Sequence, residues 1–463
     1  MDRMSGTDAL LLHMEDDDTP MHTLKVVILD TARRGRPITL DELGLAVGSR
    51  LGLVPRSTQK VVAAAGFGAR PYWIDDPEFD LRRHIDERTL ATGAAAELDA
   101  LYGELASVTL PRDRALWAMT LVHGLRDGRQ AVVVRIHHAI VDGLGALNML
   151  LAVSNEAPDG TALAPIPPAV APRSPSSVRL ALSAARDALR QLGAMPDTVG
   201  EVRSTRSRSR ANRGHPDIPS FLTGFRRWSI NEAGDATRTC ASASLDLAAM
   251  RAISKATGTT VNGVLHAVIA GAVRSELVDR GEDVSTPCRA AFGIASDASD
   301  RSHLYGNAVT PTFVNLRSDL TDRTERLVAT ARSCTAAVEA RRAAGLDLTD
   351  QLSGLAPRAL NAARRWLTRR TTMNPSHVVT ANVPGPRANR WLGSIEVVDW
   401  FSFAVAIAPA SVNITVHSYA GRMNVGLIAD PAALPDPQRL VARMADELDE
   451  LTAAVSGRAL VAA

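Results

Sequence analysis

The chain has 463 residues, an apolar content of 46% and a formal net charge of +2 at pH 7. This length is typical of two ordinary domains, and so small a net charge gives no electrostatic argument for a nucleic-acid partner. The cysteines, Cys240, Cys288 and Cys334, form neither a metal-ligand motif nor a disulfide framework, and no window approaches the roughly 18 uninterrupted apolar residues of a spanning helix. We therefore expect a cytoplasmic protein.

The first part of the chain mixes helical and strand patterns. Capping residues and amphipathic spacing predict helices over residues 5–12, 39–51 and 95–108, and an apolar run predicts a strand over 24–29. Residues 116–125 and 131–137 are predicted as the two strands of a β-hairpin, because Asp127-Gly128 between them is a strong hairpin signal.

Two adjacent histidines, His137 and His138, stand where the second strand of this hairpin should end. Neighbouring side chains of a strand point to opposite faces, so only one imidazole can face a given cleft. An unperturbed imidazole, with a pKa of about 6.5, is suited to general-base catalysis at pH 7. Metal binding is the weaker reading, because the two rings point apart and no third ligand motif is evident.

Asp142 and Gly143 follow the histidines, ahead of a helix-compatible run over residues 144–151. The Asp142 carboxylate could orient an imidazole, or it could hold the turn through an arginine. Gly143 allows a backbone conformation that a side chain would obstruct. The residues alone leave both roles of Asp142 open.

Residues 154–220 have the composition of a linker, with a proline-rich start and one helix inside it. Apolar residues at helical spacing, Val178, Leu182, Leu189 and Leu192 among them, predict that helix. An arginine-rich run over 203–213 follows. It indicates either a solvated, poorly ordered linker or a segment that binds anionic lipid electrostatically, with about 1 kcal/mol per arginine near the surface.

The remainder of the chain, residues 221–463, again intermixes strands and helices, which favours an α/β (α+β) fold of two domains. Strands are predicted over residues 239–247, 289–294, 307–316, 377–382, 401–407, 411–418 and 423–428. Helices are predicted over residues 247–257, 260–274, 320–342 and 436–455.

The run from His137 to Gly143, His-His-Ala-Ile-Val-Asp-Gly, resembles the His-His-x-x-x-Asp-Gly motif of CoA-dependent acyltransferases. Further segments resemble those of the bacterial wax ester synthase/diacylglycerol acyltransferases, in the expected order along nearly the whole chain. They are Ser5-Gly-Thr-Asp-Ala, Pro20-Met-His, Trp73-Ile-Asp-Asp, Leu116-Trp117, Gly306-Asn307, Asn382-Val-Pro-Gly-Pro386 and Ala429-Asp430-Pro431.

The resemblance implies two sheet-and-helix subdomains that face each other across a central channel. Residues 1–153 would carry the histidine motif, 154–220 would be the linker and 221–463 the second subdomain. His138 would be the general base, and His137 and Asp142 would be structural, with Asp142 bonding an arginine. Asn262, Asn382 and Trp117 are the expected substrate contacts, beside Gly143 in the motif.

The implied activity transfers a long-chain acyl group from acyl-CoA to diacylglycerol, giving triacylglycerol and CoA without a metal or cofactor. A fatty alcohol acceptor, giving wax ester, is the nearest variant, and a peripheral membrane or lipid-droplet location would suit such substrates. A paralogue that binds acyl-CoA or lipid without turnover is the alternative class. It is raised by Gly263, which stands where the family's Asn-Asp pair has its acid.

Overall fold

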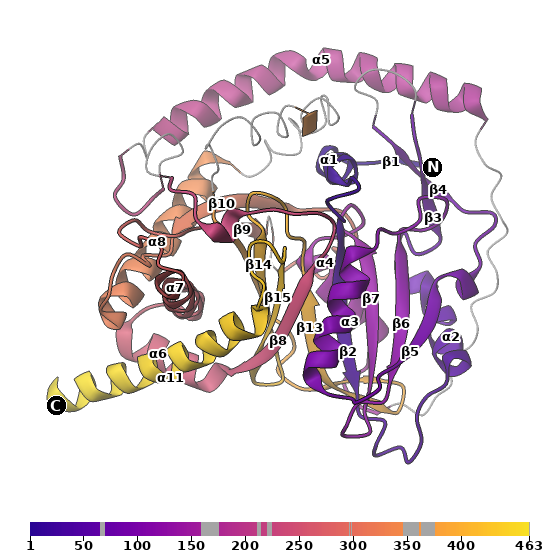
Figure 1. Cartoon of the computed structure of the whole chain (residues 1–463). Coiled ribbons are helices and arrows are strands. Elements are labelled where there is room, and N and C mark those ends of the chain that lie inside the picture. The colour runs from indigo at the N-terminus through magenta and orange to yellow at the C-terminus, as the bar shows by residue number, and fades with distance from the viewer. Residues whose placement is uncertain are drawn as a thin grey trace.

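The computed structural model describes residues 1–64, 70–158, 176–210, 214–219, 225–295, 297, 299–345, 361–362 and 376–462. Within these residues the chain forms two six-stranded sheets and one three-stranded sheet, with helices packed against them (Figure 1). The expected α/β fold of two sheet-and-helix halves is confirmed.

The N-terminal half is built on a sheet in the order β12-β13-β2-β7-β6-β5. Its helix α3 covers one face, where Leu101, Tyr102 and Leu105 pack against Leu24 and Val133. The predicted hairpin is confirmed, because β6 and β7 pair antiparallel with Trp117 opposite Ile136. The elements of this half are β1 (Asp2–Arg3), α1 (Gly6–Met14), β2 (His22–Leu29), α2 (Leu40–Gly48), η1 (Leu51–Leu53), β3 (Gln59–Val62), β4 (Tyr72–Asp75), η2 (Leu81–Arg83), β5 (Ile85–Thr89), α3 (Ala95–Ser107), β6 (Trp117–His123), β7 (Gln130–His137) and α4 (Gly143–Val153).

The C-terminal half is built on a sheet in the order β10-β9-β11-β14-β15-β8, with α7 buried between that sheet and the helices α8 and α11. Among the described helices, α7 alone is long and apolar enough to cross a membrane, but most of it is buried inside the protein as a core helix. The elements are η3 (Ser229–Asn231), β8 (Thr239–Asp246), α6 (Leu247–Thr257), α7 (Val261–Asp279), β9 (Arg289–Ala295), β10 (Val309–Asn315), α8 (Arg323–Ala344), β11 (Val378–Val383), β14 (Val412–Tyr419), β15 (Arg422–Ala429) and α11 (Pro437–Ala462).

Two strands cross from the C-terminal part of the chain into the N-terminal sheet. They are β12 (Arg390–Leu392) and β13 (Ile395–Phe403), and β13 pairs antiparallel with β2, with Ser402 opposite Lys25. The strand expected over residues 401–407 therefore begins earlier and ends at Phe403. A division of the chain at residue 221 does not separate the two sheets, because pairing with a partner so distant in sequence leaves no local pattern.

Helix α5 (Ser177–Arg210) lies along the outside of the molecule and reaches from one half to the other (Figure 1). The helix predicted in the linker is confirmed, but residues 203–210, expected as part of a solvated run, continue it. Arginine is a good helix former, and no proline or glycine interrupts this run. Residues 159–175 and 211–213 lie outside the described part of the chain.

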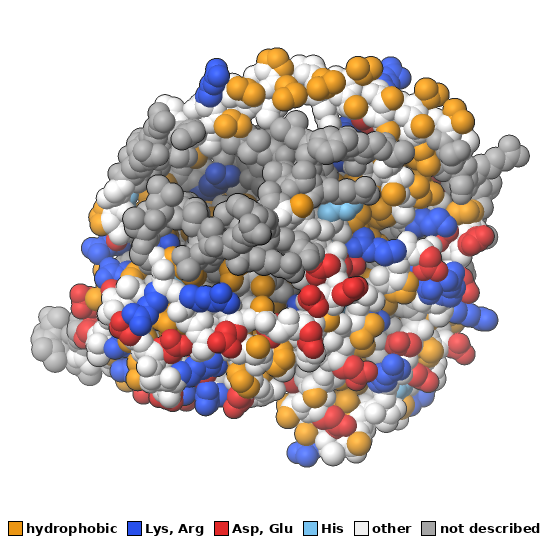
Figure 2. All heavy atoms as spheres, turned by 45° about the horizontal axis from the view of Figure 1, so that its top comes forward, with side chains coloured by type: hydrophobic (Ala, Val, Ile, Leu, Met, Phe, Trp, Pro, Cys, Tyr) orange, Lys and Arg blue, Asp and Glu red, His pale blue; other side chains and the backbone are white. Residues whose placement is uncertain are grey.

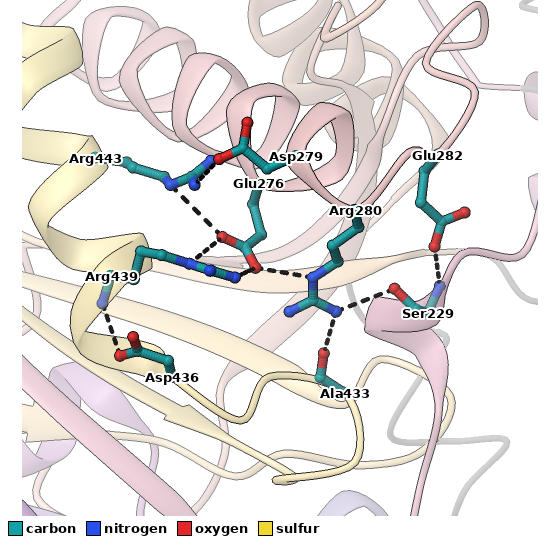
Figure 3. Close-up of polar contacts among 9 residues, drawn as sticks. All are labelled: Ser229, Glu276, Asp279, Arg280, Glu282, Ala433, Asp436, Arg439 and Arg443. Atoms are coloured by element: carbon teal, nitrogen blue, oxygen red, sulfur yellow. Dashed lines mark hydrogen bonds and ion pairs between the residues drawn. The ribbon is translucent and has the colours of Figure 1, made fainter.

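A buried carboxylate joins α7 to α11 (Figure 3). Glu276, only 1% exposed, accepts hydrogen bonds from Arg280 Nε at 2.8 Å and Arg439 Nη2 at 2.5 Å. Burial alone would raise the pKa of Glu276, but these two arginines hold that pKa below its usual range. Arg280 Nη1 also donates to the carbonyl of Ala433 at 2.8 Å, so the same network fixes the turn before α11.

Candidate active site

The two histidines lie at the end of β7 and face opposite sides of the N-terminal sheet. His137 stands opposite His22, whose Nε2 lies 3.0 Å from the carbonyl of Leu105, so this pair points towards α3. The backbone N–H of His138 donates to the carbonyl of Met21 at 2.7 Å. By strand alternation, His138 faces the other side, together with Ile136.

The interior histidine has a protein group close to each ring nitrogen. His137 Nδ1 accepts a hydrogen bond from the backbone N–H of Ala139 at 3.0 Å, and Nε2 lies 3.3 Å from Glu15 Oε2, within ion-pair distance but without hydrogen-bond geometry. Burial would raise the pKa of Glu15, but His137 and Arg112 lower that pKa to about 2. An ionised carboxylate therefore faces His137, which supports the predicted structural role of this imidazole.

The second histidine has a fixed backbone and an uncommitted ring. Asn307 Nδ2 donates both to the His138 carbonyl at 2.7 Å and to Asp8 Oδ1 at 2.8 Å. Neither ring nitrogen of His138 hydrogen-bonds another residue in the described ranges. Burial lowers the pKa of His138, so at neutral pH the ring is unprotonated and able to accept a proton.

Asp142 connects the two halves and caps a helix. Its Oδ1 accepts from the backbone N–H of Gly145 at 2.9 Å, which caps the N-terminus of α4. Its Oδ2 accepts from His303 Nε2 at 3.0 Å and from the backbone N–H of Ala308 at 2.9 Å. Its side-chain partner is thus His303, and the expected bond to an arginine is corrected.

Gly143 owes its place to close packing rather than to its backbone conformation. Its φ is not positive, and a Cβ at this position would lie 3.3 Å from Val383 Cγ2 on β11 of the other half. The stricter requirement falls on Gly145, where a Cβ would lie 2.4 Å from Val141 Cγ2 and 3.3 Å from His303. The sequence prediction chose the first glycine of the pair and missed the second.

The predicted asparagines come together from distant parts of the C-terminal half. Asn382 Nδ2 on β11 donates to Asn262 Oδ1, near the start of α7, at 3.1 Å. Val383, the next residue of β11, packs against Gly143 of α4, so by strand alternation the Asn382 side chain points to the opposite face of the sheet, towards α7. The contact of the two asparagines with substrate stays a prediction.

Gly263 does not open a gap in the site. A Cβ at this position would lie 2.7 Å from the Cβ of Ala331 on α8, and the Gly263 N–H is capped by Thr260 Oγ1 at 3.0 Å. The position is the third of α7, where an acid would serve the helix cap. In this chain the position of the family's acid therefore lies in the contact between α7 and α8.

An apolar cavity of about 190 Å³ lies against the face of the N-terminal sheet that carries Val132, Val134 and Ile136. Strands β2, β6, β7 and β13 form its floor, and α2, η1 and α4 form its walls. Trp117 lines the cavity, and its Nε1 donates to the carbonyl of Ser57 at 2.7 Å. Its contact with substrate stays a prediction. The charged residues in the lining are Lys25, Arg50 and Arg56.

The sequence analysis missed several residues at this site. Asp8 and Asn307, which fix the motif backbone, stood in segments used only for the resemblance. His303 carried no signal, because only folding brings it to Asp142. Lys25 could have been noticed, since it is one of three lysines in the chain and interrupts an apolar strand. In the described ranges, no cluster of three or more His, Cys, Asp or Glu residues could hold a metal ion.

Comparison with known proteins identifies the family of this chain. The family model of the wax ester synthase/diacylglycerol acyltransferase catalytic domain matches residues 4–265, and the model of the WS/DGAT C-terminal domain matches residues 305–452. Two Mycobacterium tuberculosis H37Rv proteins named as candidate diacylglycerol O-acyltransferases are similar to this chain. One is 33% identical over 99% of this chain and 98% of its own length, and the other is 32% identical over 97% and 96%.

Solved structures share the fold. The wax ester synthase/diacylglycerol acyltransferase from Marinobacter aquaeolei VT8 matches with a TM-score of 0.70 at 24% identity, over 98% of this chain and 100% of that chain. The starter condensation domain of rhizomide synthetase, in complex with C8-CoA, matches with a TM-score of 0.57 at 12% identity, over 98% and 94%. The chain belongs to the wax ester synthase/diacylglycerol acyltransferase family.

Proposed function

We propose that the protein transfers a long-chain acyl group from acyl-CoA to the hydroxyl of diacylglycerol, releasing triacylglycerol and CoA. The observation that carries this proposal is the difference between the surroundings of the two adjacent histidines. His137 is contacted by Ala139 and Glu15, whereas no other described residue hydrogen-bonds the ring of His138, which strand alternation assigns to the sheet face that the apolar cavity covers. Membership of the family supplies the reaction class.

In the proposed mechanism His138 is the general base. It takes the proton from the acceptor hydroxyl as that oxygen attacks the thioester carbonyl, and then gives the proton to the departing CoA thiolate. A base of this kind contributes about 10²–10⁴-fold to the rate. No acyl-enzyme is required, and all three cysteines are buried, with burial raising the pKa of each thiol, which disfavours a thiolate nucleophile.

The apolar cavity suits the hydrocarbon part of a lipid substrate. Its lining is almost wholly aliphatic and aromatic, and burying a chain there would gain about 0.8 kcal/mol per methylene. A fatty alcohol acceptor has the same apolar character as diacylglycerol, so wax ester formation remains the nearest variant of the proposal. The non-catalytic alternative loses its main argument, because Gly263 packs against α8.

The test is an ester assay with the purified protein. Labelled palmitoyl-CoA would be incubated with diacylglycerol or hexadecanol, and the products separated by chromatography. We expect labelled triacylglycerol from the wild type and at least about a 100-fold loss in His138→Ala. His215→Ala, at an exposed histidine, is the matched control. Absence of any ester from the wild type would refute the activity, and full activity in His138→Ala would refute the assigned base.

We also propose that the protein works at a lipid surface, held there by α5. An apolar stripe on the outer side of this helix is 43% to 69% exposed, and Figure 2 shows apolar side chains gathered along it. The stripe consists of Val178, Leu182, Leu189, Leu192, Met195 and Val199. The opposite side of α5 touches both halves, through Asp187 with Tyr72 at 2.6 Å and through Arg208 with the carbonyl of Ala344 at 2.9 Å.

Three exposed arginines, Arg179, Arg186 and Arg190, flank the stripe along one side. An amphipathic helix with an apolar face and a basic flank binds in the headgroup region of anionic membranes. We expect co-sedimentation with anionic liposomes at low salt, and its loss in the double variant Leu189→Glu/Leu192→Glu. Leu45→Glu, at an exposed leucine on α2, should still bind. Equal sedimentation of all three proteins would contradict this location.

A further inference from the structure

Lys25 is a buried amine in the wall of the apolar cavity. It lies in the middle of β2, is 6% exposed, and lines the cavity beside Val27 and Val134. Removing an ammonium group from water costs several kcal/mol unless good partners replace the water. An amine in this position therefore needs an explanation, since any apolar residue would fill the strand at a lower cost.

The protein provides a partner for only one of the hydrogen-bond donors of this amine among the described residues. Lys25 Nζ donates to Ser402 Oγ at 2.6 Å, and Ser402 stands directly opposite on β13 and is fully buried. Across the described residues Ser402 is its sole hydrogen-bond partner, whereas a protonated amine has three donors. At least one donor is thus left to point into the cavity.

Strand alternation puts this donor on the same face of the sheet as the proposed base. Lys25 pairs with Val134 on β7, and Val134, Ile136 and His138 lie on one face because each is two residues from the next. His137, on the other face, is opposite His22. Lys25 lines the apolar cavity together with Val134 and Ile136, and burial, together with the charge of Lys25, lowers the pKa of the nearby His138.

The inference rests on the proposed function. We propose that Lys25 donates a hydrogen bond to the carbonyl oxygen of the acyl thioester and stabilises the oxyanion formed there, with Ser402 as the residue that positions the amine. A tetrahedral intermediate of acyl transfer needs such a donor, and a preorganised cation in an apolar site is an effective one.

The step conserves atoms and charge. The acceptor oxygen forms a bond to the thioester carbon while its proton passes to His138, and the carbonyl π electrons move to the oxygen that faces Lys25. When the carbon–sulfur bond breaks, its electrons leave with the CoA thiolate and the carbonyl forms again. The thiolate takes the proton from His138. Lys25 retains its protons throughout.

The charged and titratable groups around Lys25 agree with this role. Burial lowers the pKa of Lys25 to about 8, while the nearby Asp142 carboxylate raises it. Burial, and to a smaller extent the charge of Lys25, lowers the pKa of His138 and of His417 on β14, so both imidazoles are neutral when the amine is charged. At neutral pH the site therefore combines a cationic donor with an unprotonated base.

The experiment compares Lys25→Met with Lys255→Met, a substitution at an exposed lysine on α6. For Lys25→Met we expect kcat to fall by about 100-fold or more, with little change in KM for acyl-CoA. Binding of an S-alkyl-CoA thioether, which lacks the carbonyl oxygen, should be equal in both variants. The melting temperature of Lys25→Met should be at least that of the wild type, because a buried charge has been removed.

The pH profile gives a second readout. Wild-type kcat should decline above about pH 8 as Lys25 loses its proton, and the residual activity of Lys25→Met should lack this decline. Ser402→Ala keeps the amine but removes the hydroxyl that positions it, so this substitution should lower kcat less than Lys25→Met does. The inference is overturned if Lys25→Met retains the kcat of Lys255→Met, or if it weakens thioether binding as much as it lowers kcat. If the wild type forms no ester, the proposed function fails first, and the role of Lys25 fails with it.

Discussion

Side chains at the motif differ in role because each finds a different environment within a few residues. His137 and His138 are chemically identical, but one points towards α3 and Glu15 and the other, by strand alternation, towards the opposite face of the sheet. Asp142 shows the same dependence on surroundings. Its contacts to Gly145, His303 and Ala308 make it a connection between the halves rather than a partner of the base.

The Asp142–His303 pair predicts a pH dependence of stability. Asp142 raises the pKa of His303, so His303 holds its proton more tightly in the folded protein than in the unfolded chain. This stabilisation is complete below the unfolded pKa of about 6.5 and is lost as pH rises through the folded pKa. We expect the melting temperature of the wild type to fall more steeply than that of His303→Gln as the pH rises above about 6.5. Parallel curves for the two proteins would contradict the pair.

At the scale of elements, α7 is shaped by what packs against it. It is apolar enough to resemble a spanning helix, yet its glycines admit neighbouring side chains. A Cβ at Gly271 would lie 2.2 Å from Glu447 Cδ of α11, and that carboxylate pairs with the buried Arg326 of α8 at 2.5 Å. Three helices thus meet at a position where only glycine fits.

Gly271→Ala should therefore destabilise the protein by about 2–4 kcal/mol, because the carboxylate must move and the buried ion pair must stretch. Gly200→Ala in α5 is the matched control, since nothing lies within 4 Å of its added methyl group. It should stabilise by up to about 1 kcal/mol through helix propensity. Denaturant unfolding of both variants measures the difference, and equal midpoints would show that α11 can shift at no cost.

At the scale of the whole molecule, the two halves share strands. Arg390 at the start of β12 donates to the Ser154 carbonyl at 2.6 Å, and Tyr419 of the C-terminal sheet donates to the Val397 carbonyl on β13 at 2.7 Å. The N-terminal sheet is thus completed by chain that has already passed through the C-terminal half. The halves cannot unfold independently without breaking β13 away from β2.

Calorimetry should accordingly show one unfolding transition. Leu121→Ala in the N-terminal half and Leu277→Ala in the C-terminal half remove fully buried side chains, and each should cost about 2–5 kcal/mol. Because the transition is shared, both substitutions should shift the same peak. Two peaks, each moved by only one of the substitutions, would contradict this coupling.

Local pattern was sufficient for most elements and for the motif. The hairpin of β6 and β7, the helices α3, α6 and α7, and the histidine pair at the strand end were all predicted, because periodicity and turn residues act over a few positions. The crossover of β12 and β13, the His303 partner of Asp142 and the position of Lys25 were not predicted. Each depends on contacts between residues more than 100 positions apart.

The sequence by itself determined the fold class and the family, since these follow from short-range patterns and from motifs spread along the chain. The family resemblance, and not the spacing, predicts His138 as the base. The tertiary structure decided which groups surround that base. It set His137 against Glu15, turned Gly263 towards α8, and brought Lys25 and Ser402 to one wall of the cavity. The physical reason is that burial and partner contacts, which set pKa and orientation, arise only when distant segments pack together.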